Sequence, residues 1–85
     1  MTKSVFTDAY ASLLRELVAL RKRERVTQVE LSNRLGKPQS FISTIERGVR
    51  RLDILEFYAI ARALGVDPAT TYADLIKALP DKVDV

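Results

Sequence analysis

Residues 27–48 constrain this chain more than any other stretch, because they predict two short helices joined by an enforced turn. Leu31 and Leu35 are four residues apart, so they share one face of the first helix. Gly36 follows where a helix ends most easily on a residue of positive φ. Pro38 suits the first turn of a new helix, since that turn does not need the missing N–H. The second helix takes its apolar positions from Phe41, Ile42 and Ile45, and it ends at Gly48.

Three further segments carry helix start and stop signals. Residues 7–23 begin with a threonine N-cap and then place leucines at spacings of three and four. Residues 53–65 begin with Asp53 and Glu56, the two members of a capping box, and end at a glycine. Residues 67–79 begin with an Asp-Pro pair and end before a proline. The buried side of the 53–65 helix is assigned to Leu52, Leu55, Phe57, Ile60, Ala61 and Leu64.

These segments predict an all-α protein, a compact bundle of five short helices with no alternating strand pattern. A chain of 85 residues is enough for one domain, to which we assign residues 7–80. Residues 1–6 are expected to be a flexible leader, and residues 81–85 a charged tail.

Positive charge is concentrated around the two central helices. Residues 21–51 contain nine Lys and Arg side chains and three acidic ones, a net charge of +6, whereas the rest of the chain has a net charge of −3. Such a face suits a polyanion. The alternative is an ordinary solvated charged surface, which is what most charged segments form.

Residues 27–48 also resemble the helix-turn-helix of the Xre family, the phage Cro and cI repressor-like DNA-binding domains. The similarity extends from about Tyr10 to Val66. Ser32 replaces the more usual alanine but is still small, and Pro38 stands where relatives often have a phosphate-binding Ser or Thr. The residues that carry the resemblance are Gln28, Ser32, Gly36, Ile42, Ile45, and the Glu46-x-Gly48 motif.

The resemblance implies a lambda repressor-like domain whose second helix enters the major groove of double-stranded DNA. The N-terminal residues of such a helix reach base edges, which makes Gln39 and Ser40 the first candidates. Thr44 occupies a position that relatives use for base contact. Phe41 has two interpretations, a core residue or an apolar contact with a thymine methyl.

A second group of residues is expected to contact the DNA backbone, which gives affinity and register but no sequence information. In the family, the residue equivalent to Gln28 bonds a phosphate and braces the first Gln of the recognition helix, here Gln39. The family also pairs Arg21 with Glu46 in a partly buried ion pair, so Arg21 is excluded from the DNA contacts. The backbone candidates are Thr27, Gln28, Lys37, Ser43, Arg50 and Arg51.

Relatives bind near-palindromic sites as twofold dimers, and the last helix provides a candidate dimer surface. Its apolar residues either complete the core of the monomer or form part of a homodimer, and we favour the dimer. These residues are Tyr72, Leu75, Ile76 and Leu79.

The resemblance therefore implies a sequence-specific transcriptional regulator, with repression as the favoured mode. The alternative is a protein-interaction module, such as an antitoxin that binds a partner protein and represses its own operon. Cysteine and histidine are both absent, which removes thiolate metal ligands and the commonest general base, so we expect no enzymatic activity, metal or cofactor. With no apolar run of roughly 20 residues and no signal core, a cytoplasmic protein that does not enter the membrane is expected.

Overall fold

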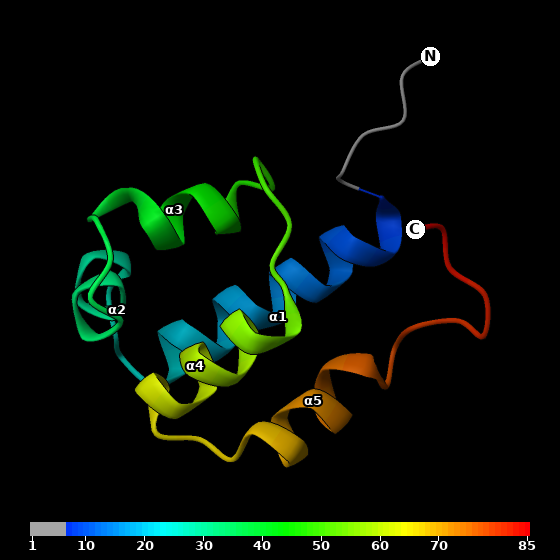
Figure 1. Cartoon of the computed structure of the whole chain (residues 1–85). Coiled ribbons are helices and arrows are strands. Elements are labelled where there is room, and N and C mark those ends of the chain that lie inside the picture. Colours follow the sequence, from blue (N-terminus) through cyan, green and yellow to red (C-terminus); the bar gives the residue numbers. More distant parts are fainter. Residues whose placement is uncertain (1–6) are drawn as a thin grey trace.

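The computed structural model describes residues 7–85, within which five α-helices and no strand occur (Figure 1). The predicted all-α class is thereby confirmed. The predicted division into leader, domain and tail stays a prediction, and residues 1–6 lie outside the described residues. No helix among the described residues is long and apolar enough to cross a bilayer. The helices are α1 (Asp8–Arg23), α2 (Gln28–Arg34), α3 (Ser40–Glu46), α4 (Ile54–Leu64) and α5 (Pro68–Ile76).

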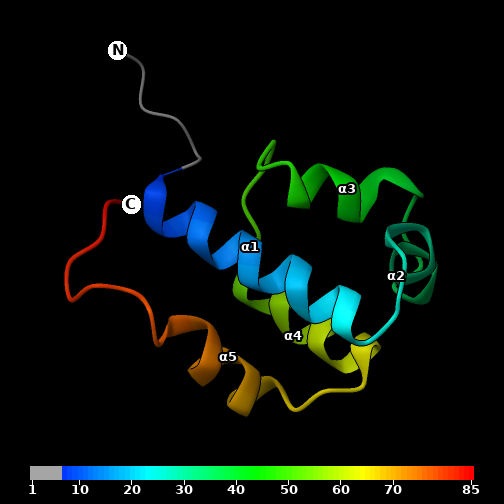
Figure 2. The same cartoon turned by 180° about the vertical axis from the view of Figure 1, so that it is seen from behind.

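The helices α1 and α4 both contribute to the larger apolar core cluster, and α5 packs against both of them. In Figures 1 and 2, α3 lies on one side of this pair, α5 lies on the opposite side, and α2 closes the end. The larger core cluster contains Leu17, Leu20, Val26, Leu31, Ile42, Phe57, Ile60, Ala61 and Leu64. A smaller cluster, formed by Tyr10, Leu14 and Ile45, joins the first half of α1 to α3.

Four of the five helices begin at a side chain that caps them. Thr7, Thr27, Asp53 and Asp67 each accept a hydrogen bond from the backbone N–H three residues further on. The helix α3 is the exception, because Gln39 in front of it makes no side-chain cap.

Four helices end with the same hydrogen-bond pattern, which we call the left-handed helix ending. One residue of positive φ follows the helix; its N–H bonds the carbonyl three positions back, and the next N–H bonds the carbonyl five positions back. The predicted turn at Gly36 is one of these endings. The residues of positive φ are Arg25 (62°), Gly36 (68°), Gly48 (74°) and Gly65 (78°).

Two helix boundaries differ from the sequence prediction. The helix α3 begins at Ser40 rather than Pro38, although the Pro38 carbonyl already accepts a 3.0 Å hydrogen bond from the N–H of Phe41. The helix α5 ends at Ile76 rather than Leu79. Beyond it the N–H of Leu79 bonds the carbonyl of Ile76, three residues back, because the following proline disfavours α-helical geometry at the residue before it.

One core assignment was wrong. Leu55 was placed on the buried side of α4, but it is 76% exposed. Phe57, Ile60 and Leu64 define the buried face, and a residue two positions before Phe57 lies about 200° around the helix, on the opposite side.

Candidate nucleic-acid interface

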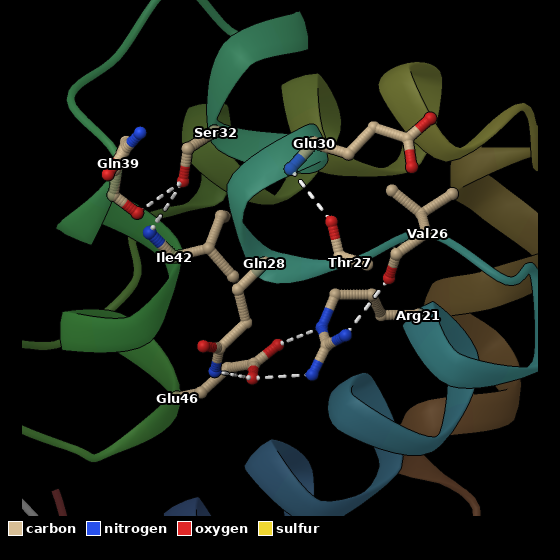
Figure 3. A network of polar contacts seen from close by, with 9 residues as sticks. All are labelled: Arg21, Val26, Thr27, Gln28, Glu30, Ser32, Gln39, Ile42 and Glu46. Atoms are coloured by element: carbon tan, nitrogen blue, oxygen red, sulfur yellow. Dashed lines mark hydrogen bonds and ion pairs between the residues drawn. The ribbon is translucent and has the colours of Figure 1, made fainter.

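A buried serine fixes the angle between α2 and α3. Ser32 is 0% exposed, and its Oγ accepts a 3.2 Å hydrogen bond from the N–H of Ile42 while donating one of 3.3 Å to the carbonyl of Gln39 (Figure 3). Ile42 is the third residue of α3, so its N–H is one that an N-cap normally satisfies. Ser32 therefore caps α3 from the neighbouring helix.

Sequence reasoning treated Ser32 only as a small residue that lets the helices cross closely, and it missed the cap. A signal for it was present: position 39 holds Gln, which is not an N-cap residue, so the first N–H groups of α3 needed an acceptor from elsewhere.

Replacing Ser32 with alanine is expected to lower the free energy of unfolding by about 1–3 kcal/mol, because the buried N–H of Ile42 would lose its acceptor. Thermal or urea unfolding measures this loss. Ser12→Ala on α1 is the control, since Ser12 is only half-buried, and its cost should stay within about 0.5 kcal/mol. A Ser32→Ala variant as stable as the parent protein would contradict the capping role.

A buried ion pair connects the end of α3 to α1. Arg21 donates from Nε to Oε2 of Glu46 at 2.7 Å and from Nη2 to Oε1 at 3.0 Å. The two side chains are only 10% and 7% exposed. Arg21 also donates from Nη1 to the carbonyl of Val26 at 2.9 Å, so the same guanidinium holds the loop before α2. The predicted pair of Arg21 and Glu46 is thus present in the structure.

The side chain of Gln28 differs from its prediction. Its Nε2 donates to Oε1 of Glu46 at 2.7 Å, whereas the predicted brace was to Gln39; in Figure 3 the Gln28 side chain lies beside Glu46, well apart from Gln39. A hydrogen bond to an ionised carboxylate is stronger than one between two neutral amides, which explains the preference. The carboxylate of Glu46 therefore joins α1, α2 and α3.

The other side of α3 presents the predicted base-reading residues. Gln39 and Ser40 are exposed at its start, and Thr44 is half-buried further along, as is Ser43, which was predicted to contact the DNA backbone instead. Phe41 is half-buried and packs against both core clusters, so its interpretation as a core residue holds at least in part.

Two of the cations predicted to contact the DNA backbone lie close to the ring of Phe41. The ammonium of Lys37 lies 5.5 Å and the guanidinium of Arg50 lies 5.3 Å from the centre of its ring. Arg50 also forms an ion pair with Glu56, and that hydrogen bond holds the pKa of the Glu56 carboxyl below its usual value. A phosphate would therefore have to share or displace the contact between Arg50 and Glu56.

Two candidates for contact with the DNA backbone remain. Thr27 lies at the start of α2, and Arg51 lies in the loop before α4. Thr27 is exposed and its Oγ1 is engaged as the cap of α2, accepting from Glu30 at 3.0 Å. The guanidinium of Arg51 lies 4.8 Å from the ring centre of Tyr10. The hydroxyl of Tyr10 accepts a 2.9 Å hydrogen bond from the N–H of Leu52, so this loop is attached to the start of α1.

The candidate dimer residues divide between core and surface. Leu75 packs against the larger core cluster, and Leu79 is half-buried beyond the end of α5. Tyr72 is 46% exposed although its ring meets Phe57 edge-on at 6.1 Å, and Ile76 is 37% exposed.

An apolar groove of about 140 Å³ lies between α1, α4 and α5, and Tyr72 and Leu75 form part of its wall. Ile54 of α4 also lines it and is 72% exposed. Tyr58, one turn further along α4, is 54% exposed. The sequence prediction did not include these α4 residues in an interaction surface, because their helix was read mainly for its buried side.

Known proteins resemble this chain in sequence and in fold. A family model described as helix-turn-helix matches residues 17–70. A protein from Pseudomonas syringae pv. tomato, described as XRE-family like, has a solved structure with a TM-score of 0.77 and 42% sequence identity, covering 85% of this chain and 88% of that one. The HTH-type transcriptional regulator y4dJ of Sinorhizobium fredii, itself uncharacterized, is 40% identical over 47 residues, which are 55% of this chain.

The alignment spans 61% of the length of y4dJ, less than two thirds of that relative. The solved structure, in contrast, is matched over most of its length. The chain therefore belongs to the Xre family of helix-turn-helix proteins, the Cro/C1 type.

Proposed function

We propose that this protein is a sequence-specific DNA-binding transcriptional regulator that represses by occupying a palindromic operator as a homodimer. One observation carries the proposal: the start of α3 is exposed, while the opposite side of the same helix is fixed by the core and by the buried pair of Arg21 and Glu46. A helix held in this way presents its side chains to a groove without prior rearrangement.

The contacts are assigned by the chemistry of each side chain. Gln39 can bond N6 and N7 of adenine together, and Ser40 and Thr44 are less discriminating. Phe41 is retained as a candidate for a thymine methyl, since it is only half-buried. The backbone contacts are assigned to Thr27, Gln28, Lys37, Ser43, Arg50 and Arg51, which position the domain without reading sequence.

The dimensions of the molecule support a dimer on DNA. Half-sites in neighbouring major grooves lie about 34 Å apart. The protein measures 35 × 28 × 20 Å, so two copies on such half-sites would be near enough to touch. The exposed apolar side chains of Tyr72, Ile76 and Ile54 provide a surface for that contact. As a regulator of this kind, the protein would act in the cytoplasm.

The test is selection from random DNA duplexes by the purified protein, followed by sequencing of the bound fraction. The expected result is an inverted repeat. The double variant Gln39→Ala, Thr44→Ala should lose the enrichment, because each good bidentate base contact contributes about 1–3 kcal/mol of discrimination. Thr71→Ala, on α5 and away from α3, is the control and should select the same repeat.

Other outcomes would contradict parts of the proposal. A single half-site without a repeat would argue against the dimer. No enriched sequence, together with binding that fades steeply in salt, would leave only backbone attraction. The partner-binding module, with the apolar groove between α1, α4 and α5 as its docking surface, would then be the leading function.

A further inference from the structure

The four left-handed helix endings allow a comparison within one molecule. Three of them have glycine at the residue of positive φ, and these are all the glycines that the chain contains. The fourth, which ends α1, has Arg25 at φ 62°. Its hydrogen bonds match the others: the N–H of Arg25 bonds Lys22 at 3.0 Å, and that of Val26 bonds Arg21 at 3.2 Å.

A side chain at this position is unfavourable, because in the left-handed region Cβ crowds the following carbonyl oxygen. Glycine avoids the crowding, and it occupies this position in each of the other three helix endings that the structure describes. An observed backbone outlier of this kind justifies a hypothesis of function.

Nothing within the described residues compensates for the choice of arginine. The side chain of Arg25 is exposed, and its guanidinium makes no hydrogen bond, ion pair or ring contact with the rest of the described chain. Arg25 is also not needed to complement the helix dipole at the end of α1, since Arg21, Lys22 and Arg23 already occupy the last turn.

The position of Arg25 suggests what it binds. Arg25 lies three residues before Gln28, whose side chain bonds Glu46 at the end of α3. The backbone of this loop is fixed by two hydrogen bonds between Arg21 and Val26. The guanidinium of Arg21 donates to the carbonyl of Val26, and the N–H of Val26 donates to the carbonyl of Arg21. Among the described residues, Arg25 is therefore a cation without a partner on a rigid loop, directly beside the contacts that connect α1, α2 and α3.

We infer that Arg25 binds a phosphate of the DNA backbone, so that this helix ending gives up stability in exchange for affinity. The inference rests on the proposed DNA-binding function and adds a contact to it. Arginine suits the role because its planar fork can engage two phosphate oxygens together.

The experiment compares Arg25→Gly, Arg25→Lys and Lys77→Gln with the parent protein. For each, the melting temperature and the affinity for one DNA duplex are measured between 0.05 and 0.3 M salt. Lys77 is an exposed lysine at the end of α5, on the opposite side from α3, so its replacement removes the same charge away from the proposed contact.

Arg25→Gly is expected to melt on the order of 4 °C higher, because the crowding is relieved. The same variant should bind DNA less tightly. One lost phosphate contact lowers the magnitude of the slope of log K against log salt by about 0.9, which corresponds to an affinity roughly eightfold lower at 0.1 M salt.

Arg25→Lys keeps both the charge and the crowding, so it should keep most of the affinity and the parent melting temperature. Lys77→Gln should retain the parent slope.

Two results would overturn the inference. In one, Arg25→Gly binds with the affinity and slope of the parent protein; in the other, Lys77→Gln loses as much as Arg25→Gly. A parent protein that shows no salt-dependent DNA binding at all would be a different failure, that of the proposed function itself. The parent measurement therefore separates the two proposals.

Discussion

Replacing Glu46 with alanine is expected to lower the free energy of unfolding by about 3–5 kcal/mol, the usual cost of leaving one partner of a buried ion pair alone. The guanidinium of Arg21 would keep only its hydrogen bond to Val26, in a site where its side chain is 10% exposed. The amide of Gln28 would lose its acceptor as well. Urea unfolding measures the change as a lower midpoint at an unchanged slope.

An exposed ion pair on the same protein is the control. Asp74 and Lys77 lie 3.2 Å apart with side chains 64% and 76% exposed, so Asp74→Ala should cost less than about 1 kcal/mol. The double variant Arg21→Met, Glu46→Leu should recover much of the loss, because an apolar pair of similar volume carries no desolvation penalty. A Glu46→Ala variant no less stable than Asp74→Ala would mean that the pair is effectively solvated.

Replacing Ile42 with alanine is expected to cost about 2–5 kcal/mol of unfolding free energy. Ile42 is 2% exposed and belongs to the core cluster formed with α1, α2 and α4. The helix α3 has only seven residues, and its buried residues are Ile42 and Ile45, so few other contacts can hold it. The deletion leaves a cavity where α3 meets the rest of the protein, and the melting temperature and urea midpoint would both report it.

Ser43→Ala provides the comparison for Ile42, since it alters the next, half-buried position of the same helix and should stay within about 0.5 kcal/mol. Equal stability of the two variants would show that α3 does not depend on its apolar anchors. In that case the fixed presentation of Gln39 and Thr44 would also lose its support.

The number of helices and most of their starts were predictable, because they depend on local signals. The capping box of Asp53 and Glu56 is formed, and Gly36 has the positive φ that the turn required. The family resemblance located the pair of Arg21 and Glu46, which spans 25 positions of the chain and leaves no mark in local periodicity.

Three features were not predicted, each for a different reason. The partner of Gln28 could not be inferred, because the stronger bond to the carboxylate of Glu46 can form only if the packing of α2 and α3 brings the two side chains within reach. The exposure of Leu55 was missed because an apolar residue was equated with a buried one, without regard to its angle around the helix. The positive φ at Arg25 was missed because the sequence has no glycine or asparagine there, the residues that usually mark such a helix ending.

The cap that Ser32 supplies to α3 has a consequence for how this protein can change over time. In many helices Ser, Thr, Asp or Asn is strongly preferred at the residue before the first turn, so its identity is restricted. Here the acceptor is Ser32 of α2, so the side chain at position 39 does not have to cap α3. If Gln39 reads bases as proposed, its substitution would alter which operator is preferred while the start of α3 stays intact, so new binding preferences could be sampled with little loss of stability.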